Sequence, residues 1–187
     1  AQELKKLFFE VIIANNFDSD ALKILKTKKN LRLIDASKYI FKSDLKFTSN
    51  NEEILVQSED IKKMNIKDFK VVSRKKPNTK QMKDLLFAFN VCRYVKSNAI
   101  VLASDETTTG IGSGQPSRLD SCQIAIDKMK KFTDTKDEIV AASDAFFPFV
   151  DGIEKLVQSG VTAVIQPSGS IRDKEIIRYA NETNTIL

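Results

Sequence analysis

Histidine is absent from the 187 residues, and only two cysteines, Cys92 and Cys122, are present. Zinc sites in proteins are built from cysteine and histidine at short, regular spacings, and these two cysteines have no such spacing. We therefore expect no zinc. Both cysteines are expected to serve as small buried apolar groups.

Long apolar runs are also missing. No run of about 18 apolar residues occurs, so a membrane-spanning helix is not expected. The first residues, "AQELKKLFFEVIIANN", contain acids and lack a cleavage-site pattern, which argues against a signal peptide. The cytoplasm is the expected location. With 42% apolar residues, the chain can bury the core of one ordinary domain or two small ones.

Positive charge is in excess, with a formal net charge of +5 that comes from lysine clusters such as "KILKTKKN" and "SRKKPNTK". Such charge suits nucleic acid or an anionic small molecule. The clusters carry few interleaved aromatic residues and match no nucleic-acid-binding module, which favours a solvated lysine-rich surface. We therefore expect no nucleic-acid partner.

The N-terminal part begins with a β-α-β pattern. "FFEVIIA" predicts a buried strand, "DSDALKILKTK" a helix capped by Asp18 or Asp20, and "LRLIDA" a strand parallel to the first. "DLKFTSN" and "EEILVQS" then alternate like the strands of a hairpin. Because "SRKKPN" is typical of an exposed connector, we place a domain boundary near Ser73, giving residues 1–72 and 73–187.

Beyond this boundary, helices and strands alternate. Asn78 and Gln81 predict a capping box for a helix whose apolar face is Met82, Leu85, Leu86, Phe89, Cys92 and Val95. The strands "AIVLAS", "EIVAAS" and "VTAVIQ" are separated by two further helices, the first of which buries Leu119, Cys122, Ile126 and Met129. Ser170 and Asp173 predict an acidic capping box for the final helix. This alternation predicts an α/β protein with a three-layer α/β/α fold and a mostly parallel mixed sheet. The closing "NTIL" resembles the start of another strand, as expected for a fragment.

Four segments fall at strand ends or helix starts, where the sites of open α/β sheets lie: "KSNA", "GIGSGQPSR", "SDAFFPFVD" and "PSGS". The glycine-rich segment lacks the ending of a phosphate-binding P-loop. Gly112 and Gly114 allow close approach of the backbone and Arg118 offers a fork of donors for an anion, although glycines of a tight turn with an exposed arginine explain the segment equally well. "PSGS" suits either an anion or helix capping by Ser170.

The segment "SDAFFPFVD" places three phenylalanines and a proline between two aspartates. At least one of Phe146, Phe147 and Phe149 is expected to be a core residue that covers the end of the sheet. The stiff, acid-flanked segment also suits a flat heteroaromatic ligand, because it offers apolar faces to the ring and acceptors to its amines.

In this order, the four segments resemble the aminoimidazole carboxamide ribonucleotide (AICAR) formyltransferase domain of the bifunctional purine-biosynthesis enzymes, which also carry an IMP cyclohydrolase domain. "VKSNAIVLA", "GIGSGQPSRLDS", "ASDAFFPFVDGIE" and "GVTAVIQPSGSIRDKE" carry the resemblance, and "FFEVIIANNFDSDALKILKTKKNLRL" extends it to the N-terminus. It is weakest between Ser37 and Lys75. The resemblance implies a cytidine-deaminase-like fold without zinc and an intimate homodimer. It makes residues 1–72 the tail of the first transformylase subdomain with a hairpin, and 73–187 the second, incomplete at its C-terminus.

The resemblance also implies a reaction and its residues. The family transfers a formyl group from 10-formyltetrahydrofolate to the amine of AICAR, and cyclisation then gives IMP. Asn98 and Arg118 match positions that contact the nucleotide, with Asn98 in a supporting catalytic role. Positions that line the folate site are matched by Leu119, Pro148, Phe149, Asp151 and Ser170. A structural potassium site is matched by Asp144, Ser97 and the backbone around Cys92 and Val95.

One departure from the family pattern matters for activity. The catalytic lysine-histidine pair of the family lies upstream of the matched segments, and this sequence contains no histidine. We therefore expect the chain alone to be inactive. The alternatives are a catalytically incomplete module that binds nucleotide or folate or forms a dimer and, less favoured, an RNA-binding domain driven by the lysines.

Overall fold

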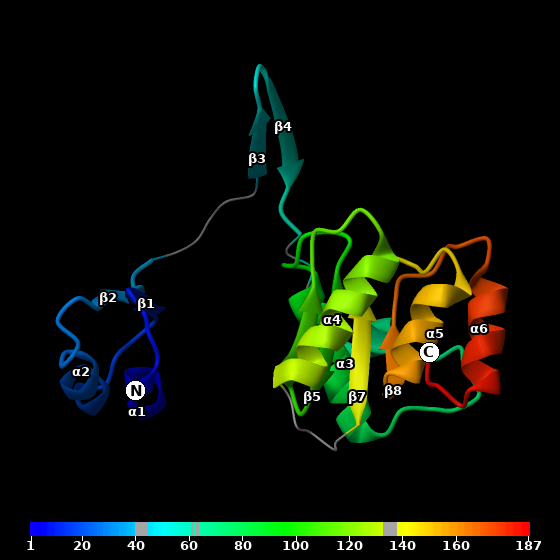
Figure 1. The fold of residues 1–187 in the computed structure, drawn as a ribbon. Helices are drawn as coiled ribbons and strands as arrows, with labels where there is room; N and C mark the ends of the chain where they lie inside the picture. Colours follow the sequence, from blue (N-terminus) through cyan, green and yellow to red (C-terminus); the bar gives the residue numbers. More distant parts are fainter. Residues whose placement is uncertain (40–44, 61, 63, 133–137) are drawn as a thin grey trace. The chain divides into compact units, whose positions relative to one another are not determined.

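The computed structural model describes residues 1–39, 45–60, 62, 64–132 and 138–187. Two compact units, Ala1–Ile61 and Lys62–Leu187, make up the chain (Figure 1). The boundary predicted near Ser73 falls within the second unit, where the N–H of Ser73 donates to the main-chain oxygen of Leu187 at 3.2 Å. The assignment of the two parts to transformylase subdomains stays a prediction.

The first unit opens with the expected β-α-β pattern. After α1 (Gln2–Lys6), strand β1 (Val11–Ala14) leads through α2 (Ser19–Leu25) to β2 (Arg32–Asp35). Strands β1 and β2 pair in parallel. Asp18 caps α2 by accepting the N–H of Ala21 at 2.6 Å, which confirms one of the two caps predicted.

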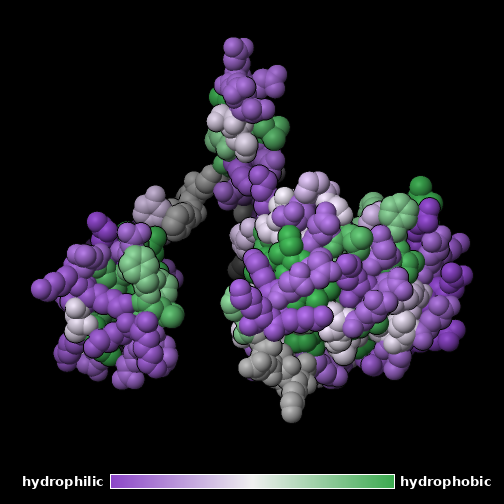
Figure 2. Space-filling view, viewed as in Figure 1, coloured by the Kyte–Doolittle hydropathy of each residue, from purple (hydrophilic) through white to green (hydrophobic). Residues whose placement is uncertain are grey.

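The predicted hairpin follows in the same unit. Strands β3 (Leu45–Asn50) and β4 (Glu53–Ser58) pair antiparallel. Asn51 turns the chain with a φ of 52°, a conformation that asparagine tolerates well. Asp44, the first residue of the expected strand, lies outside the described residues. Figure 2 shows hydrophobic side chains along the hairpin below a hydrophilic tip, and Phe47, Ile54 and Val56 are among the exposed apolar residues.

The second unit is built around a four-stranded sheet. A 3-10 turn (Ile66–Asp68) and α3 (Thr79–Cys92) precede β5 (Ile100–Ser104), β6 (Thr107–Gly112), α4 (Arg118–Phe132) and β7 (Ile139–Ser143), and α5 (Val150–Gln158), β8 (Val161–Ile165) and α6 (Asp173–Glu182) complete it. The strand order is β6-β5-β7-β8. The α/β class and the mixed sheet are confirmed.

Less of this sheet is parallel than the sequence indicated. β5 runs antiparallel to both β6 and β7, while β7 and β8 are parallel and Ala163 makes a parallel bridge to Ile186. The cause is β6, which was not among the predicted strands and whose last residues were assigned to the glycine-rich segment. Asp105 and Glu106, with φ of 52° and 50°, form a tight turn that sends the chain straight back along β5.

Two apolar clusters fill the two sides of the sheet. Ile100 and Leu102 of β5 pack with α4 and α5, whereas Val101 and Ala103 of the same strand pack with α3. Figure 1 shows α4 and α3 on opposite sides of the strands. The second unit is therefore the three-layer α/β/α arrangement that the sequence predicts.

The capping box of α3 is confirmed, but its buried face differs from the apolar stripe expected. Asn78 accepts the N–H of Gln81 at 2.8 Å, and the Gln81 side chain accepts the N–H of Asn78 at 3.0 Å. The buried residues of α3 are Gln81, Asp84, Leu85, Ala88 and Cys92. Polar residues occupy this face because they have partners in the sheet: Gln81 donates to Thr162, and Asp84 accepts the N–H of Glu106.

The predicted face of α4 is largely confirmed. Cys122, Ile126 and Met129 are buried, while Leu119 is half-buried. Both cysteines are free and buried, as expected of small apolar groups. None of the helices in the described segments is long and apolar enough to cross a membrane.

Candidate functional site

All four segments singled out in the sequence lie at one edge of the sheet. β6, β7 and β8 run in one direction and β5 runs against them. The carboxyl ends of those three strands therefore meet the amino end of β5. "KSNA" precedes β5, and the glycine-rich, aromatic and "PSGS" segments follow β6, β7 and β8. This edge is the candidate site.

Arg118, the first residue of α4, joins two of these strand ends. Its guanidinium group donates to Ser143 Oγ at 3.0 Å and Asp144 Oδ1 at 2.5 Å, both at the end of β7. It also donates to Asn98 Oδ1 at 2.9 Å, in front of β5. Only 11% of the Arg118 side chain is exposed. The alternative of a merely exposed arginine is therefore wrong.

Both the nitrogen and the oxygen of the Asn98 side-chain amide form hydrogen bonds within the site. Its amide nitrogen donates to the main-chain oxygens of Gln115 at 2.9 Å and Pro116 at 3.0 Å, and its own oxygen accepts from Arg118. The main-chain oxygen of Asn98 accepts from Ser121 Oγ at 2.8 Å. Asn98 thereby fixes the loop between β6 and α4 and orients the guanidinium group.

The carboxylate of Asp144 is held in its ionised form. Desolvation by burial acts to raise the pKa, but hydrogen bonds from Ser97, Arg118 and the Ala99 N–H, together with the charge of Arg118, lower it below the usual value for an aspartate. Ser97 Oγ donates to Asp144 Oδ2 at 2.5 Å. The site thus contains a mostly buried, paired arginine and aspartate.

Two of the positions matched to a potassium site, Ser97 and Cys92, have side chains near this aspartate. Ser97 contacts Asp144 directly, and the main-chain oxygen of Cys92 accepts the N–H of Val95 at 3.1 Å. Burial raises the pKa of the Cys92 thiol to about 12, with a further upward contribution from Asp144 and an opposing one from Arg118. The thiol is therefore not an anionic ligand. Within the described segments, no group of three or more Cys, Asp or Glu residues is arranged to hold a metal ion.

The glycines of the "GIGSG" segment have a packing role. A Cβ on Gly112 would lie 1.9 Å from the main-chain oxygen of Ser121, and one on Gly110 would lie 2.1 Å from that of Ala125. The close approach foreseen for Gly112 is therefore an approach of β6 to α4. Gly114 instead agrees with the alternative interpretation as a glycine of a tight turn, because its φ is +67°.

The aromatic segment divides into one core residue and two exposed ones. Phe147 is 1% exposed, and its ring lies against Gly152, where a Cβ would come within 2.6 Å of it. Phe146 and Phe149 are 39% and 51% exposed. The prediction of at least one core phenylalanine is confirmed, and the other two present ring surface at the edge of the sheet.

The "PSGS" segment does not cap α6 in the way predicted. The helix begins at Asp173, after an N-cap residue, Arg172, that makes no side-chain cap bond. Ser170 Oγ accepts the N–H of Arg172 at 3.1 Å, and Asp173 Oδ2 accepts the N–H of Gly169 at 2.8 Å. The two side chains stabilise a turn in this loop. The helix therefore begins two residues later than the expected start at "IRDKE".

Two contacts join the aromatic segment to residues on either side of "PSGS". The side-chain oxygen of Gln166 accepts the N–H of Phe147 at 2.8 Å. The guanidinium carbon of Arg172 lies 4.7 Å from the centre of the Phe149 ring, a cation-π geometry. Leu119 lies in the first turn of α4, which packs against α5, the helix that carries Asp151.

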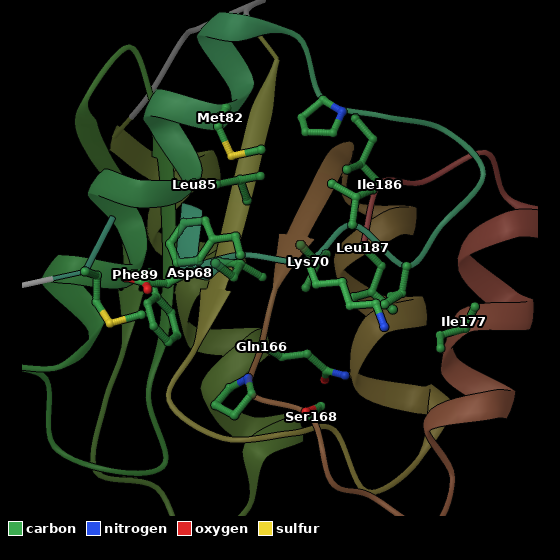
Figure 3. Close-up of a pocket in the computed structure, with 18 residues that line it drawn as sticks. Asp68, Lys70, Met82, Leu85, Phe89, Gln166, Ser168, Ile177, Ile186 and Leu187 are labelled. Atoms are coloured by element: carbon green, nitrogen blue, oxygen red, sulfur yellow. The ribbon is translucent and has the colours of Figure 1, made fainter. Parts of the chain in front are cut away.

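A cavity of about 490 Å³ lies behind the "PSGS" segment and not at Arg118. Figure 3 shows Met82, Leu85 and Phe89 of α3 on one side and Ile186, Leu187 and Gln166 on the other. Its lining is mainly apolar, with Asp68, Lys70, Gln166 and Ser168 as polar members. Of the predicted site residues, none lines it.

Sequence reasoning missed Ser143, Ser121, Gln166 and Arg172. Ser143 could have been recognised from the sequence, because it is the polar last residue of the otherwise apolar strand "IVAAS". Gln166 likewise follows directly on the apolar run of β8. Ser121 could not have been recognised, since it lies on the buried face of α4 among apolar residues.

Residues 1–128 match the model of the family described as AICARFT/IMPCHase bienzyme. Three curated relatives, each named bifunctional purine biosynthesis protein PurH, match nearly the whole chain. The one from Caldicellulosiruptor saccharolyticus is 46% identical over 186 residues, covering 98% of this chain and 35% of that protein. The one from Buchnera aphidicola subsp. Schizaphis graminum is 46% identical over 187 residues, covering 98% and 36%. The one from Aquifex aeolicus is 45% identical over 182 residues, covering 97% and 35%. The chain thus spans about a third of the length of these relatives.

Proposed function

Because the chain belongs to the AICARFT/IMPCHase bienzyme family, we propose that it supplies part of an AICAR formyltransferase site of purine biosynthesis in the cytoplasm. The reaction would move the formyl group of 10-formyltetrahydrofolate to the amine of AICAR, giving formyl-AICAR on the way to IMP. The observation that carries the proposal is the arrangement at the edge of the sheet. There, the fork of Arg118 bonds to the start of β5 and the end of β7, and the exposed aromatic segment follows β7.

Arg118 and Asn98 are proposed to bind the nucleotide. The guanidinium group is a fixed fork that suits anionic and carbonyl oxygens, and burial strengthens each of its hydrogen bonds. Both side chains carry N–H donors, so both can donate hydrogen bonds to the substrate. Asn98 would contact AICAR by releasing one of its two carbonyl partners, Gln115 or Pro116.

Pro148, Phe149 and Asp151 are proposed to hold the folate, with Leu119 and Ser170 beside them. Phe149 is 51% exposed and can stack on a flat ligand, and Pro148 is also exposed. Asp151 is exposed in the first turn of α5, where its carboxylate can accept the amino groups of a pterin. Holding both substrates in register is itself a large part of catalysis of this kind.

Proton transfer would come from outside residues 1–187. The amine of AICAR is a poor nucleophile, so attack on the formyl carbon needs a group that takes the proton of the amine. This sequence has no histidine, the residue that most often does so. The 187-residue chain alone is therefore proposed to be inactive, and this absence favours the second candidate, a module that binds substrate or forms a homodimer without completing the chemistry.

The residues matched to the potassium site fit an oxygen-ligated cation. The Asp144 carboxylate, the Ser97 hydroxyl and the main-chain oxygens of Cys92 and Val95 are the donor types that hard cations take. The protonated Cys92 thiol would not take part. A potassium ion held there would tie the end of α3 to the end of β7.

The test is a formyl-transfer assay of the complete gene product that contains residues 1–187. Arg118→Lys keeps the charge but loses the fork, and we expect a fall in kcat/KM of about 100-fold, the equivalent of one charged hydrogen bond. Phe149→Ala should raise the KM for the folate and leave the KM for AICAR unchanged. Lys128→Ala, on the exposed face of α4, is the control. Full activity of Arg118→Lys, or formyl transfer by the isolated chain at the rate of the complete product, would contradict the proposal.

A further inference from the structure

The segment Asp144–Phe149 is anchored at its start. The Asp144 carboxylate accepts the N–H of Ala99 at 3.1 Å besides its bonds to Ser97 and Arg118. Ser143 Oγ donates to the main-chain oxygen of Ala145 at 2.7 Å. These bonds fix the first two residues to the start of β5 and to Arg118 of α4, but they do not reach the exposed Pro148 and Phe149.

A second pair of anchors lies at Phe147. Its ring packs on Gly152 of α5, in space that no side chain at position 152 could share. Its N–H is bonded to Gln166 Oε1 at 2.8 Å. Since Phe147 is 1% exposed, this donor has lost access to water, and leaving it unpaired would cost about 1–3 kcal/mol.

Gln166 is therefore the link between the loops that follow β7 and β8. It is the first residue after β8 and begins the segment that leads to Ser170. Figure 3 shows it near Ser168, at the side of the cavity away from Met82. Its bond to Phe147 joins one loop to the other, and Phe147 comes directly before Pro148 in the chain. The bond therefore sets the position of the Pro148–Phe149 surface relative to Ser170.

We infer that Gln166 is a positioning residue for the folate co-substrate: its bond to the Phe147 N–H holds the Pro148–Phe149 surface in register with the loop that carries Ser170. This inference rests on the proposed function for the identity of the ligand. Gln166 does not itself touch the reacting atoms. Its effect belongs to folate binding and not to the nucleotide, because Arg118 and Asn98 are held by separate bonds.

The experiment compares two variants of the complete gene product. Gln166→Leu keeps the volume and removes the acceptor, whereas Gln166→Glu keeps an acceptor at the same reach. We expect Gln166→Leu to raise the KM for 10-formyltetrahydrofolate about tenfold, the loss of one hydrogen bond to a buried donor, with the KM for AICAR and kcat at saturation within about twofold of wild type. Gln166→Glu should restore the folate KM to within about threefold. Lys174→Ala, exposed on α6, is the matched control.

A second readout does not depend on catalysis. Hydrogen exchange of the Phe147 amide should accelerate at least about tenfold in Gln166→Leu and stay slow in Gln166→Glu. Unchanged exchange, or equal rises in the KM of both substrates, would overturn the positioning role. If the wild-type product transfers no formyl group while the Phe147 amide responds as expected, the proposed function fails and the link between the two loops stands.

Discussion

At the scale of residues, Asp144 makes the charge balance of the site depend on pH. Its pKa is lowered because hydrogen bonds and the charge of Arg118 outweigh desolvation. A group whose folded pKa is lowered stabilises the fold above its unfolded pKa, about 3.9, and this contribution is lost as pH falls through the folded pKa. The stabilisation should therefore be complete at neutral pH and disappear only in acid.

Asp144→Asn tests this dependence. At pH 7 the substitution leaves the mostly buried Arg118 without its anion, and we expect a loss of about 3 kcal/mol in the free energy of unfolding. The difference from wild type should shrink as pH falls below about 4, because the Asp144 carboxyl of the unfolded wild-type chain then takes up a proton, which favours unfolding. Urea unfolding between pH 7 and pH 3 measures it, with Asp127→Asn on the exposed side of α4 as control. A difference that is constant across this range would refute the assignment.

Gly112 carries the second prediction at this scale. A methyl group there would collide with the main-chain oxygen of Ser121, which α4 cannot withdraw without separating from β6. We expect Gly112→Ala to lower the free energy of unfolding by about 3 kcal/mol. Thermal unfolding should show the loss, and Ser113→Ala, at the exposed neighbouring position, should change stability little. If Gly112→Ala were as stable as wild type, the close packing of β6 against α4 would not be the reason for glycine at this position.

At the scale of elements, helix caps and the pairs β1–β2 and β3–β4 were predictable, but the antiparallel pairing of β5 was not. Asp18 and the Asn78–Gln81 box were identified from the sequence because a helix cap involves residues only three positions apart. β6 was missed because its turn uses Asp105 and Glu106, which are not the glycine-containing pair that signals such a hairpin. Because β6 was not predicted, nothing in the sequence indicated that the strand "AIVLAS" is antiparallel to its neighbours.

The same turn supplies a stabilising substitution. Glu106 adopts a φ of 50°, which costs a residue with a side chain about 1 kcal/mol relative to glycine. Its main-chain N–H donates to Asp84 at 2.7 Å, a bond that glycine would retain. We expect Glu106→Gly to raise the free energy of unfolding by about 1 kcal/mol. Chemical denaturation measures this, and Thr107→Gly, one residue later in β6, should instead destabilise the protein. Destabilisation by both would show that the turn is not strained.

At the scale of the whole molecule, the order of the motifs in the sequence predicted which segments form the site. Only the strand order explains how these segments contact one another. The four segments were each identified in the sequence, including Arg118 and Phe149. Their mutual contacts depend on the strand order β6-β5-β7-β8, which places the end of β7 beside the start of β5. The bonds from Arg118 to Asn98 and from Phe147 to Gln166 follow from that order, and no local pattern encodes it.

The distribution of the core leads to the last prediction. Both apolar clusters belong wholly to Lys62–Leu187, whereas Leu25 is the one buried apolar side chain among the described residues of Ala1–Ile61. The short two-stranded sheets of the first unit bury too little surface to be stable alone. We therefore expect residues 62–187 to fold and unfold cooperatively by themselves, with a Tm within about 5 °C of the 187-residue chain.

Separate expression of the two units tests this expectation. Residues 1–61 should show no cooperative thermal transition by circular dichroism, because their apolar side chains, among them Phe8, Ile13 and Ile34, stay exposed. Residues 62–187 should keep the near-ultraviolet signal of packed aromatic rings, to which the buried Phe147 contributes. If residues 62–187 were unfolded at 25 °C, the stability of the sheet would have to come from contacts with the first unit, and the site at its edge could not be assigned to the second unit alone.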